Sequence, residues 1–141
     1  MINVVFVCTG NTCRSPMAEG IFNAEAEKRS FPARACSRGV SANGGESANK
    51  YAVEALAGLG VDIKRHRARG ISGQDIVKAD IVYCIARSHY DVLQREFPRY
   101  RDKIVMISEA GIEDPFGCDF QKYESTARQI ESEVKEILDS L

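Results

Sequence analysis

The chain opens with an apolar run that ends in a cysteine, and a polar loop and a proline follow. The run Ile2–Val7 is rich in β-branched residues and is closed by Cys8. A short run of this composition predicts a buried strand. After the loop, Ser15 and Pro16 have the pattern of an N-cap followed by proline at the first helical position. The sequence therefore predicts a strand, a tight loop and a helix N-terminus in direct succession.

A loop that curls over a helix N-terminus is suited to bind an anion. The first backbone N–H groups of a helix lack intrahelical acceptors, and the helix dipole adds partial positive charge. Gly10 is expected to let the backbone curl, and the planar guanidinium of Arg14 can hold two phosphate oxygens. The sequence thus predicts a phosphate-binding loop. The residues expected to make up this substrate-binding loop are Thr9, Gly10, Asn11, Thr12, Cys13 and Ser15.

Cys8 lies at the base of this loop. Backbone donors and a nearby arginine favour the thiolate form of a cysteine, and the thiolate is the nucleophile. The hydroxyl of Ser15 can donate a hydrogen bond to that thiolate and improve it as a leaving group in a second step. Without the loop, Cys8 would be interpreted as a small buried hydrophobic residue at a strand end. With the loop, we interpret it as a catalytic nucleophile.

Several segments together carry a resemblance to a known family. Val7–Glu19 resembles the opening signature of the low-molecular-weight protein phosphatase family. Ser37–Val40 is similar to the family's second-strand segment, His66–Arg69 to its His-x-Ala-Arg segment, and Asp114–Phe116 to its acid loop. The resemblance covers nearly the whole chain. It implies a hydrolase that acts on phosphorylated proteins through a cysteinyl-phosphate intermediate and needs no cofactor.

The acid loop supplies the second expected catalytic residue. Breaking a bond to phosphorus requires a proton on the leaving atom, and water must later be deprotonated; one carboxyl group can do both in turn. Taken alone, an aspartate before a proline is a turn residue, but the resemblance implies that Asp114 is this acid and base. Phe116 is expected to form a wall of the substrate pocket, with ordinary loop packing as the alternative.

The resemblance also implies residues that support the loop without touching substrate. Asn11 is expected to orient the loop by hydrogen bonding, with Ser37 as its partner and His66 in the same network. Local turn bonds are an equal alternative for Asn11 and Ser37, and a surface position is the alternative for His66. His89 matches no motif and is expected on the solvent-facing side of a helix.

Thr12 bears on which phosphoprotein is the substrate. Tyrosine-directed relatives commonly carry an aliphatic residue such as isoleucine here, whereas threonine resembles the bacterial protein-arginine phosphatase branch. A hydroxyl at the pocket wall suits a polar guanidinium group, and an aromatic ring gains from apolar walls. Gly117 also stands where tyrosine-directed members often place a second aromatic residue. Protein phosphoarginine is therefore the favoured substrate, and phosphotyrosine is the alternative.

The remaining cysteines bear on two further interpretations. Cys13 is close enough in sequence to trap an oxidised Cys8 as a disulfide, and the resemblance to family members implies such a pairing. A packed thiol without this role is the alternative. An arsenate reductase of this fold would need two further cysteines close together, but Cys84 lies in a predicted strand with no cysteine in the ten residues after it. A non-catalytic phosphate-binding module would be expected to lack the nucleophile or the acid, and both are present.

Apolar β-rich runs alternate with helical patterns along the chain, which predicts an α/β fold with helices on both faces of a parallel sheet. The family resemblance implies four strands in the order 2-1-3-4, in a three-layer sandwich. After the first strand, the expected strands are 33–40, 81–85 and 103–107. The expected helices run from Pro16 to about Lys28, from a cap at Ser47 to the break at Gly58, from Gln74 to Lys78, from a cap at Ser88 to before Pro98, and from Phe120 to Leu138. Val53, Leu56 and Ala57 are expected to face inward.

Composition agrees with a single domain over residues 1–141. With 44% hydrophobic residues, a chain of this length can bury one core and is too short to suggest a second. A net charge of −1 argues against broad binding to nucleic acid or membrane surfaces. We expect neither a secretion leader nor a membrane-spanning segment, because the sequence shows no basic leader pattern and no long apolar run, and the odd number of cysteines suggests a reducing cytoplasm. We expect no metal, because no acidic or histidine cluster has ligand spacing, and a monomer, although the sequence does not determine the oligomeric state.

Overall fold

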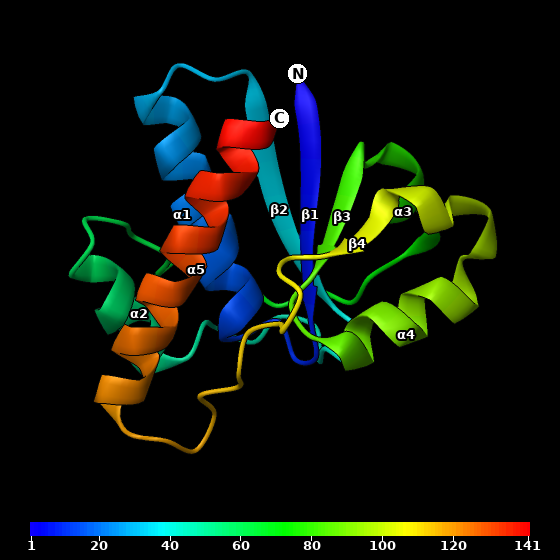
Figure 1. Ribbon diagram of the computed structural model, residues 1–141. Coiled ribbons are helices and arrows are strands. Elements are labelled where there is room, and N and C mark those ends of the chain that lie inside the picture. Colours follow the sequence, from blue (N-terminus) through cyan, green and yellow to red (C-terminus); the bar gives the residue numbers. More distant parts are fainter.

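A four-stranded parallel sheet forms the centre of the molecule, and the computed structural model describes all residues from 1 to 141 (Figure 1). The strand order is β2-β1-β3-β4 and every pair is parallel, as expected. The strands are β1 (Ile2–Cys8), β2 (Ala33–Gly39), β3 (Ile81–Cys84) and β4 (Ile104–Met106). The helices are α1 (Arg14–Lys28), α2 (Lys50–Ala57), α3 (Gly73–Lys78), α4 (Arg87–Glu96), the 3₁₀ segment η1 (Pro98–Lys103) and α5 (Phe120–Ser140).

The side chains of β1 alternate between two cores, because successive residues of a strand point to opposite faces of the sheet. Val4, Phe6 and Cys8 belong to the larger core, which contains residues of α1, α2 and α5. Val5 and Val7 belong to the smaller core with residues of α3 and α4. Figure 1 shows the same division of the helices between the two faces. Burial on both faces explains why β1 is almost continuously apolar.

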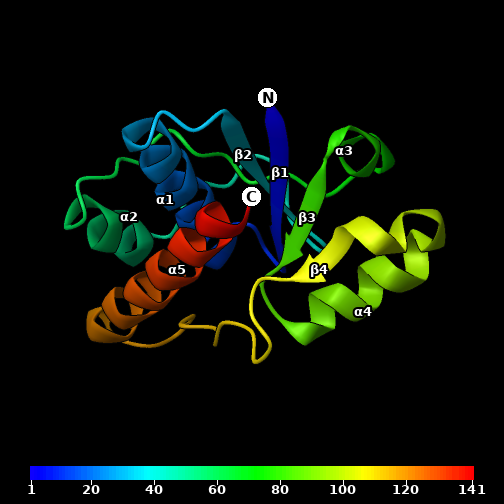
Figure 2. The ribbon, with the colours of Figure 1, turned by 45° about the horizontal axis from the view of Figure 1, so that its top comes forward.

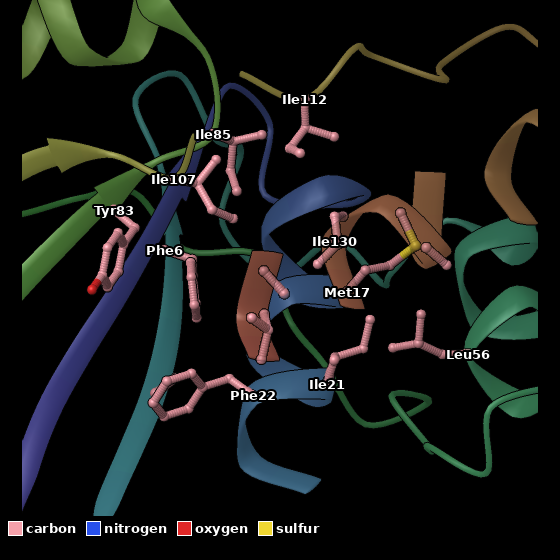
Figure 3. Packing of buried hydrophobic residues seen from close by; sticks show 14 of the residues in the cluster. Phe6, Met17, Ile21, Phe22, Leu56, Tyr83, Ile85, Ile107, Ile112 and Ile130 are labelled. Atoms are coloured by element: carbon pink, nitrogen blue, oxygen red, sulfur yellow. The ribbon is translucent and has the colours of Figure 1, made fainter. Parts of the chain in front are cut away.

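The larger core is organised around the ring of Phe6, which lies between two other aromatic rings (Figure 3). The Phe6 ring meets Phe22 of α1 edge-on at 5.8 Å between centroids, and stacks on Tyr83 of β3 at 5.7 Å. Pairs of this geometry stabilise a fold by about 0.5–1.5 kcal/mol each beyond their burial. The α5 side of this core is the stripe of residues at helical spacing that includes Tyr123, Ala127, Ile130, Val134, Ile137 and Leu138.

The starts of α1 and α2 differ from the sequence prediction. α1 begins at Arg14 rather than after Ser15, and Ser15 is fully buried inside its first turn. α2 is capped by Asn49, whose side-chain oxygen accepts a hydrogen bond from the amide of Tyr51 at 2.8 Å; Ser47 instead forms an isolated bridge to Arg67. In each case a tertiary contact occupies the residue that local sequence had favoured as the cap.

α2 and α4 also differ in which residues face inward. In α2, Leu56 is buried and Val53 is half-buried against the larger core, as predicted, but Ala57 is exposed. α4 begins at Arg87, one residue before the predicted cap Ser88. His89 of α4, expected to face solvent, is buried instead.

The loops that follow β1, β3 and β4 meet at the carboxyl end of the sheet. Figure 2 shows the segment between β4 and α5 running from this end of the sheet to the start of α5, while both chain termini lie toward the opposite end of the sheet in Figure 1. Parallel α/β sheets bind ligands at the carboxyl ends of their strands. None of the helices has the length and apolar character that crossing a membrane requires.

Candidate active site

The loop after β1 is held by backbone hydrogen bonds from the segment that follows β2. Cys8, at the end of β1, is 3% exposed. Its carbonyl accepts from the amide of Val40 at 2.9 Å, and the carbonyl of Thr9 accepts from Ser41 at 3.0 Å. The carbonyl of Thr12 accepts from the amide of Asn49 at 2.7 Å, just before α2 begins. The loop is therefore fixed by contacts from outside it.

The curl of the loop depends on Asn11 rather than on Gly10. Asn11 is fully buried and has a φ of 59°, in the left-handed region that asparagine adopts more readily than most residues. Gly10 is not among the residues with positive φ, and a Cβ placed on it would meet only the hydroxyl of Thr12, at 3.8 Å. The structure thus corrects the role expected for Gly10.

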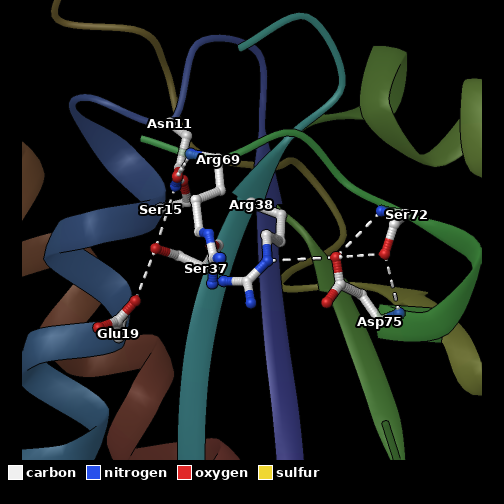
Figure 4. A network of polar contacts seen from close by, with 8 residues as sticks. All are labelled: Asn11, Ser15, Glu19, Ser37, Arg38, Arg69, Ser72 and Asp75. Carbon is white, nitrogen blue, oxygen red and sulfur yellow. Dashed lines mark hydrogen bonds and ion pairs between the residues drawn. The ribbon is translucent and has the colours of Figure 1, made fainter. Parts of the chain in front are cut away.

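The side-chain amide of Asn11 links the loop to β2 and to α1 (Figure 4). Its nitrogen donates to the hydroxyls of Ser15 at 2.8 Å and Ser37 at 3.0 Å. Its oxygen accepts from the backbone amide of Arg69 at 2.9 Å, which fixes the orientation of the amide. Asn11 and Ser37 are therefore partners, as the resemblance implied. His66 joins the same network, because its Nε2 lies 2.7 Å from the carbonyl oxygen of Asn11.

These bonds bear on the hydrogen bond between Ser15 and Cys8. The hydroxyl of Ser15 lies 2.8 Å from Sγ of Cys8 and already accepts a hydrogen bond from Asn11. Its own proton is therefore available to Cys8, and a donated hydrogen bond favours a thiolate. At the other end of the network, the hydroxyl of Ser37 donates to Oε1 of Glu19 at 2.7 Å. Glu19 was not predicted, although it lies one helical turn after Ser15 on α1.

Arg14 and Asp114 come together although they are far apart in the sequence. Arg14 is 6% exposed, and its Nη1 donates to the carbonyl of Ile112 at 3.0 Å. Its Nη2 lies 3.6 Å from Oδ2 of Asp114, whose side chain is about half exposed. Oδ1 of Asp114 accepts from the amide of Phe116 at 3.1 Å. The buried Ile112, whose amide donates to Ile85 at 2.8 Å, fixes the acid loop against the end of β3.

A cavity of about 300 Å³ opens above the loop. The residues that line it are Cys8, Thr9, Gly10, Asn11, Thr12, Cys13, Arg14, Glu46, Asp114 and Phe116. Phe116 lines the cavity and is 67% exposed. Three of the predicted site residues do not line the cavity: Ser15, Ser37 and His66. They support the loop through hydrogen bonds with Asn11. Glu46 was not predicted, because only the fold brings its loop to the mouth of the cavity.

His89 is not on the solvent-facing side of its helix, and that prediction is wrong. The ring is 2% exposed. Its Nε2 lies 2.8 Å from the hydroxyl oxygen of Thr9, and its Nδ1 accepts from the amide of Ala86 at 3.1 Å. Burial, and then the positive charge of Arg14, lower the pKa of His89 to about 4. The sequence carried no signal for this position beyond the histidine itself.

The cysteines are all unpaired. Cys13 is 7% exposed, with its sulfur 3.7 Å from the hydroxyl of Tyr123, and burial raises the pKa of its thiol. Cys84 is fully buried in β3, where burial raises its pKa to about 12. A thiol in that state is poorly suited to pass on a disulfide, which disfavours the arsenate reductase interpretation. No three His, Cys, Asp or Glu side chains are grouped so that they could hold a metal ion.

Comparison with known proteins identifies one family, both by sequence and by structure. The family model described as low molecular weight phosphotyrosine protein phosphatase matches residues 3–141. The protein-arginine-phosphatase of Bacillus subtilis (strain 168) is 32% identical, with 99% of this chain and 97% of that protein covered. The structure of a low molecular weight protein tyrosine phosphatase from T. tengcongensis superposes with a TM-score of 0.97 and 41% identity over the whole of both chains. A cysteine-to-serine mutant of the YwlE arginine phosphatase, with a phosphorylated active-site serine, superposes with a TM-score of 0.96 and 32% identity, covering 99% of this chain and 95% of that one.

Proposed function

The chain belongs to the low-molecular-weight protein phosphatase family, and we propose that within this family it is a protein-arginine phosphatase. In the proposed reaction the phosphoryl group moves from a phosphoarginine side chain to Cys8 and then to water. Such a covalent route divides one difficult displacement into two easier ones. Its products are the unmodified arginine side chain and inorganic phosphate.

In the first step, the thiolate of Cys8 attacks phosphorus and the P–N bond breaks. The electron pair of that bond goes to the guanidine nitrogen, and Asp114 donates a proton to the same nitrogen. The amides of the loop and Arg14 hold the non-bridging oxygens while charge shifts between the attacking and leaving atoms. The bond from Arg14 to Ile112 supports this proposal, because it anchors one end of the guanidinium. Nη2, which faces Asp114, lies 3.6 Å from that carboxylate, too far for a hydrogen bond, and can still donate to phosphate.

In the second step, Asp114 acts as a base. It accepts a proton from water as the water oxygen attacks phosphorus, and the S–P bond breaks with its electron pair going to Cys8. The hydroxyl of Ser15, 2.8 Å from Sγ, stabilises the departing thiolate. The half-exposed position of Asp114 at the mouth of the cavity suits a group that meets first the substrate nitrogen and then water.

The lining of the cavity is the observation that carries the choice of phosphoarginine. A guanidinium group is a planar cation that donates several hydrogen bonds and accepts none. The cavity offers it oxygen acceptors from Thr12, Asp114 and Glu46. No ion pair in the structure includes Glu46, so its carboxylate is free to meet a cation. An aromatic phosphotyrosine ring would find only Phe116 as an aromatic wall.

Phosphotyrosine remains the second candidate. The favouring observation is that the T. tengcongensis protein, 41% identical to this chain, is described as a tyrosine phosphatase. Phe116 would then stack against the phenol ring. Both candidates share Cys8, Arg14 and Asp114, so the walls of the cavity decide between them.

The test compares kcat/KM on peptides of one sequence that carry either phosphoarginine or phosphotyrosine. We expect the wild type to prefer phosphoarginine by tenfold or more, since differences in pocket polarity are typically worth about that much. Thr12→Ile should reverse the preference. Glu46→Gln should lower kcat/KM for phosphoarginine about threefold to tenfold and leave phosphotyrosine little changed. A wild-type preference for phosphotyrosine would overturn the proposal.

Glu113→Gln is the matched control for Glu46→Gln. It makes the same change of charge next to Asp114, but Glu113 does not line the cavity and is paired with Lys122 at 3.1 Å. We expect its substrate preference to equal that of the wild type. An equal loss in both variants would show that only the overall charge near the site matters, and Glu46 would then have no specific role.

A further inference from the structure

His89 connects the second half of the fold to the nucleophile loop. It lies in the first turn of α4, which follows β3, and β3 pairs directly with β1. This neighbourhood brings the ring to Thr9, the residue after Cys8, with Nε2 2.8 Å from the threonine hydroxyl oxygen. The side chain of His89 is 2% exposed.

The position of the ring proton follows from the second hydrogen bond. The backbone amide of Ala86 can only donate, so Nδ1 of His89, 3.1 Å away, must be its acceptor and carries no proton. A neutral imidazole then has its one proton on Nε2. That proton is donated to the hydroxyl oxygen of Thr9. The ring is neutral at physiological pH because burial and the charge of Arg14 lower the pKa of His89 to about 4.

The proton of the Thr9 hydroxyl is thereby left without an acceptor. Its oxygen accepts from His89, and no protein group accepts a hydrogen bond from it in the structure. Thr9 is exposed and lines the cavity beside Cys8. The oxygens of a bound phosphoryl group are the acceptors that the chemistry of this cavity would bring there, and a hydrogen bond to a charged oxygen is stronger than one between neutral groups.

We infer that His89 is a positioning residue of the active site, which holds the hydroxyl of Thr9 so that Thr9 donates a hydrogen bond to a phosphoryl oxygen of the bound substrate. The inference rests on the proposed phosphoryl transfer at Cys8, and it is independent of the amino acid that carries the phosphate. Thr9 is the contact with substrate, and His89 acts only through Thr9. No proton is transferred by either residue.

The test is a double-mutant cycle with Thr9→Val and His89→Leu, measured as kcat/KM on the phosphoarginine and phosphotyrosine peptides and as inhibition by inorganic phosphate. Thr9→Val removes the hydroxyl at nearly constant volume and should lower kcat/KM about tenfold on both peptides. Thr9→Ser keeps the hydroxyl and should retain most of the activity. The double variant should be no worse than Thr9→Val alone, because His89 has nothing left to position.

Two control variants and one fallback comparison accompany the test. His89→Gln can still donate to Thr9 and should recover part of the activity that His89→Leu loses. Ser88→Ala changes an exposed residue in the same helical turn and should leave the kinetics unchanged. If His89→Leu does not fold, the comparison of Thr9→Val with Thr9→Ser still tests whether the hydroxyl contacts the phosphoryl group.

The inference would be overturned if the losses in kcat/KM of the two single variants multiply in the double variant, or if Thr9→Val leaves the kinetics unchanged. Failure of the proposed function has a different signature. A preference of the wild type for phosphotyrosine would leave the cycle intact, because both peptides present the same phosphoryl oxygens. Absence of turnover on both peptides would remove the phosphoryl transfer on which the inference rests.

Discussion

Single contacts at the residue scale give Asp114 its proposed role. One carboxylate oxygen faces Arg14 at 3.6 Å, and the other accepts from the amide of Phe116 at 3.1 Å. These contacts orient the side chain while leaving it about half exposed to the cavity mouth. The geometry separates two properties, orientation and proton transfer, that a substitution can test independently.

Asp114→Asn should keep the orientation and lose the proton transfer, because the amide oxygen can still accept from Phe116. We expect kcat to fall by about 10²- to 10⁴-fold, the usual contribution of a general acid or base, with a much smaller change in KM. Steady-state kinetics on the preferred peptide measures both constants. A kcat within a few-fold of the wild type would mean that another group moves the proton. Glu113→Asn is the control, since Glu113 is next in sequence and outside the cavity.

Cys13 provides a test of oxidation at the same scale. If it traps an oxidised Cys8 as a disulfide, peroxide should inactivate the wild type reversibly, and added thiol should restore activity. Cys13→Ala should then lose activity irreversibly. The capture rate should rise with pH, because burial raises the pKa of the Cys13 thiol and the thiolate is the attacking form. Recovery of Cys13→Ala to the wild-type level would rule out this pairing.

At the element scale, the end of β2 supports the loop that follows Cys8. Gly39 closes β2 and lies so near the loop that a Cβ would stand 2.5 Å from the carbonyl oxygen of Thr9 and 3.1 Å from the amide of Asn11. Both neighbours are backbone atoms, which cannot rotate away as a side chain can. The close approach of strand and loop therefore requires glycine here.

Gly39→Ala should destabilise the protein by about 1–3 kcal/mol and lower kcat/KM, because the added methyl must push the loop out of place. Denaturant unfolding and kinetics on the same preparation measure the two effects. Gly44→Ala is the matched control: nothing lies within 4 Å of a Cβ there, and its φ is not positive. Equal behaviour of the two variants would show that the loop tolerates the shift.

The elements also show what sequence patterns can and cannot predict. Periodicity identified all four strands and the inner stripe of α5, because burial of one face repeats regularly along an element. It missed the cap at Asn49, because Ser47 and Asn49 are equally good N-cap residues by local sequence, and the structure uses the one whose amide bonds to Thr12 across the fold. It misplaced His89 for the same reason, since only the pairing of β3 with β1 brings α4 to the loop. Features set by contacts between distant segments were therefore beyond local reasoning.

Family resemblance, not periodicity, anticipated the arrangement of the whole molecule. The strand order 2-1-3-4 and the meeting of Arg14 with Asp114 both require knowledge of which distant segments are neighbours. Glu19 and Glu46 were missed because they belong to no quoted motif, although both contact or line the site. In the whole molecule the site is continuous with the core, so the buried groups of the site also affect the stability of the fold.

His89 couples stability to pH. In the unfolded chain it binds a proton with a pKa of 6.5, whereas in the folded protein its pKa is about 4. Between these values the unfolded state binds more protons, so the free energy of unfolding rises with pH and falls on acidification. The contribution of His89 should be lost progressively from about pH 6.5 down to about pH 4, by up to about 3 kcal/mol. Urea unfolding at several pH values measures it.

His89→Gln is the reference for this prediction, because glutamine does not titrate. Its free energy of unfolding should depend less on pH than that of the wild type over this window. The same slope in both proteins would show that other groups determine the acid sensitivity and that the imidazole is not kept neutral by the fold.

The most direct test of the central claim is to detect the phosphoryl group on Cys8 during turnover. Rapid acid quench of the wild type with the phosphoarginine peptide, followed by intact mass measurement and peptide mapping, should find one phosphoryl group per chain, located on Cys8. Cys8→Ala should show neither the adduct nor turnover. Sustained turnover with no adduct, or an adduct on a different residue, would contradict a mechanism based on Cys8.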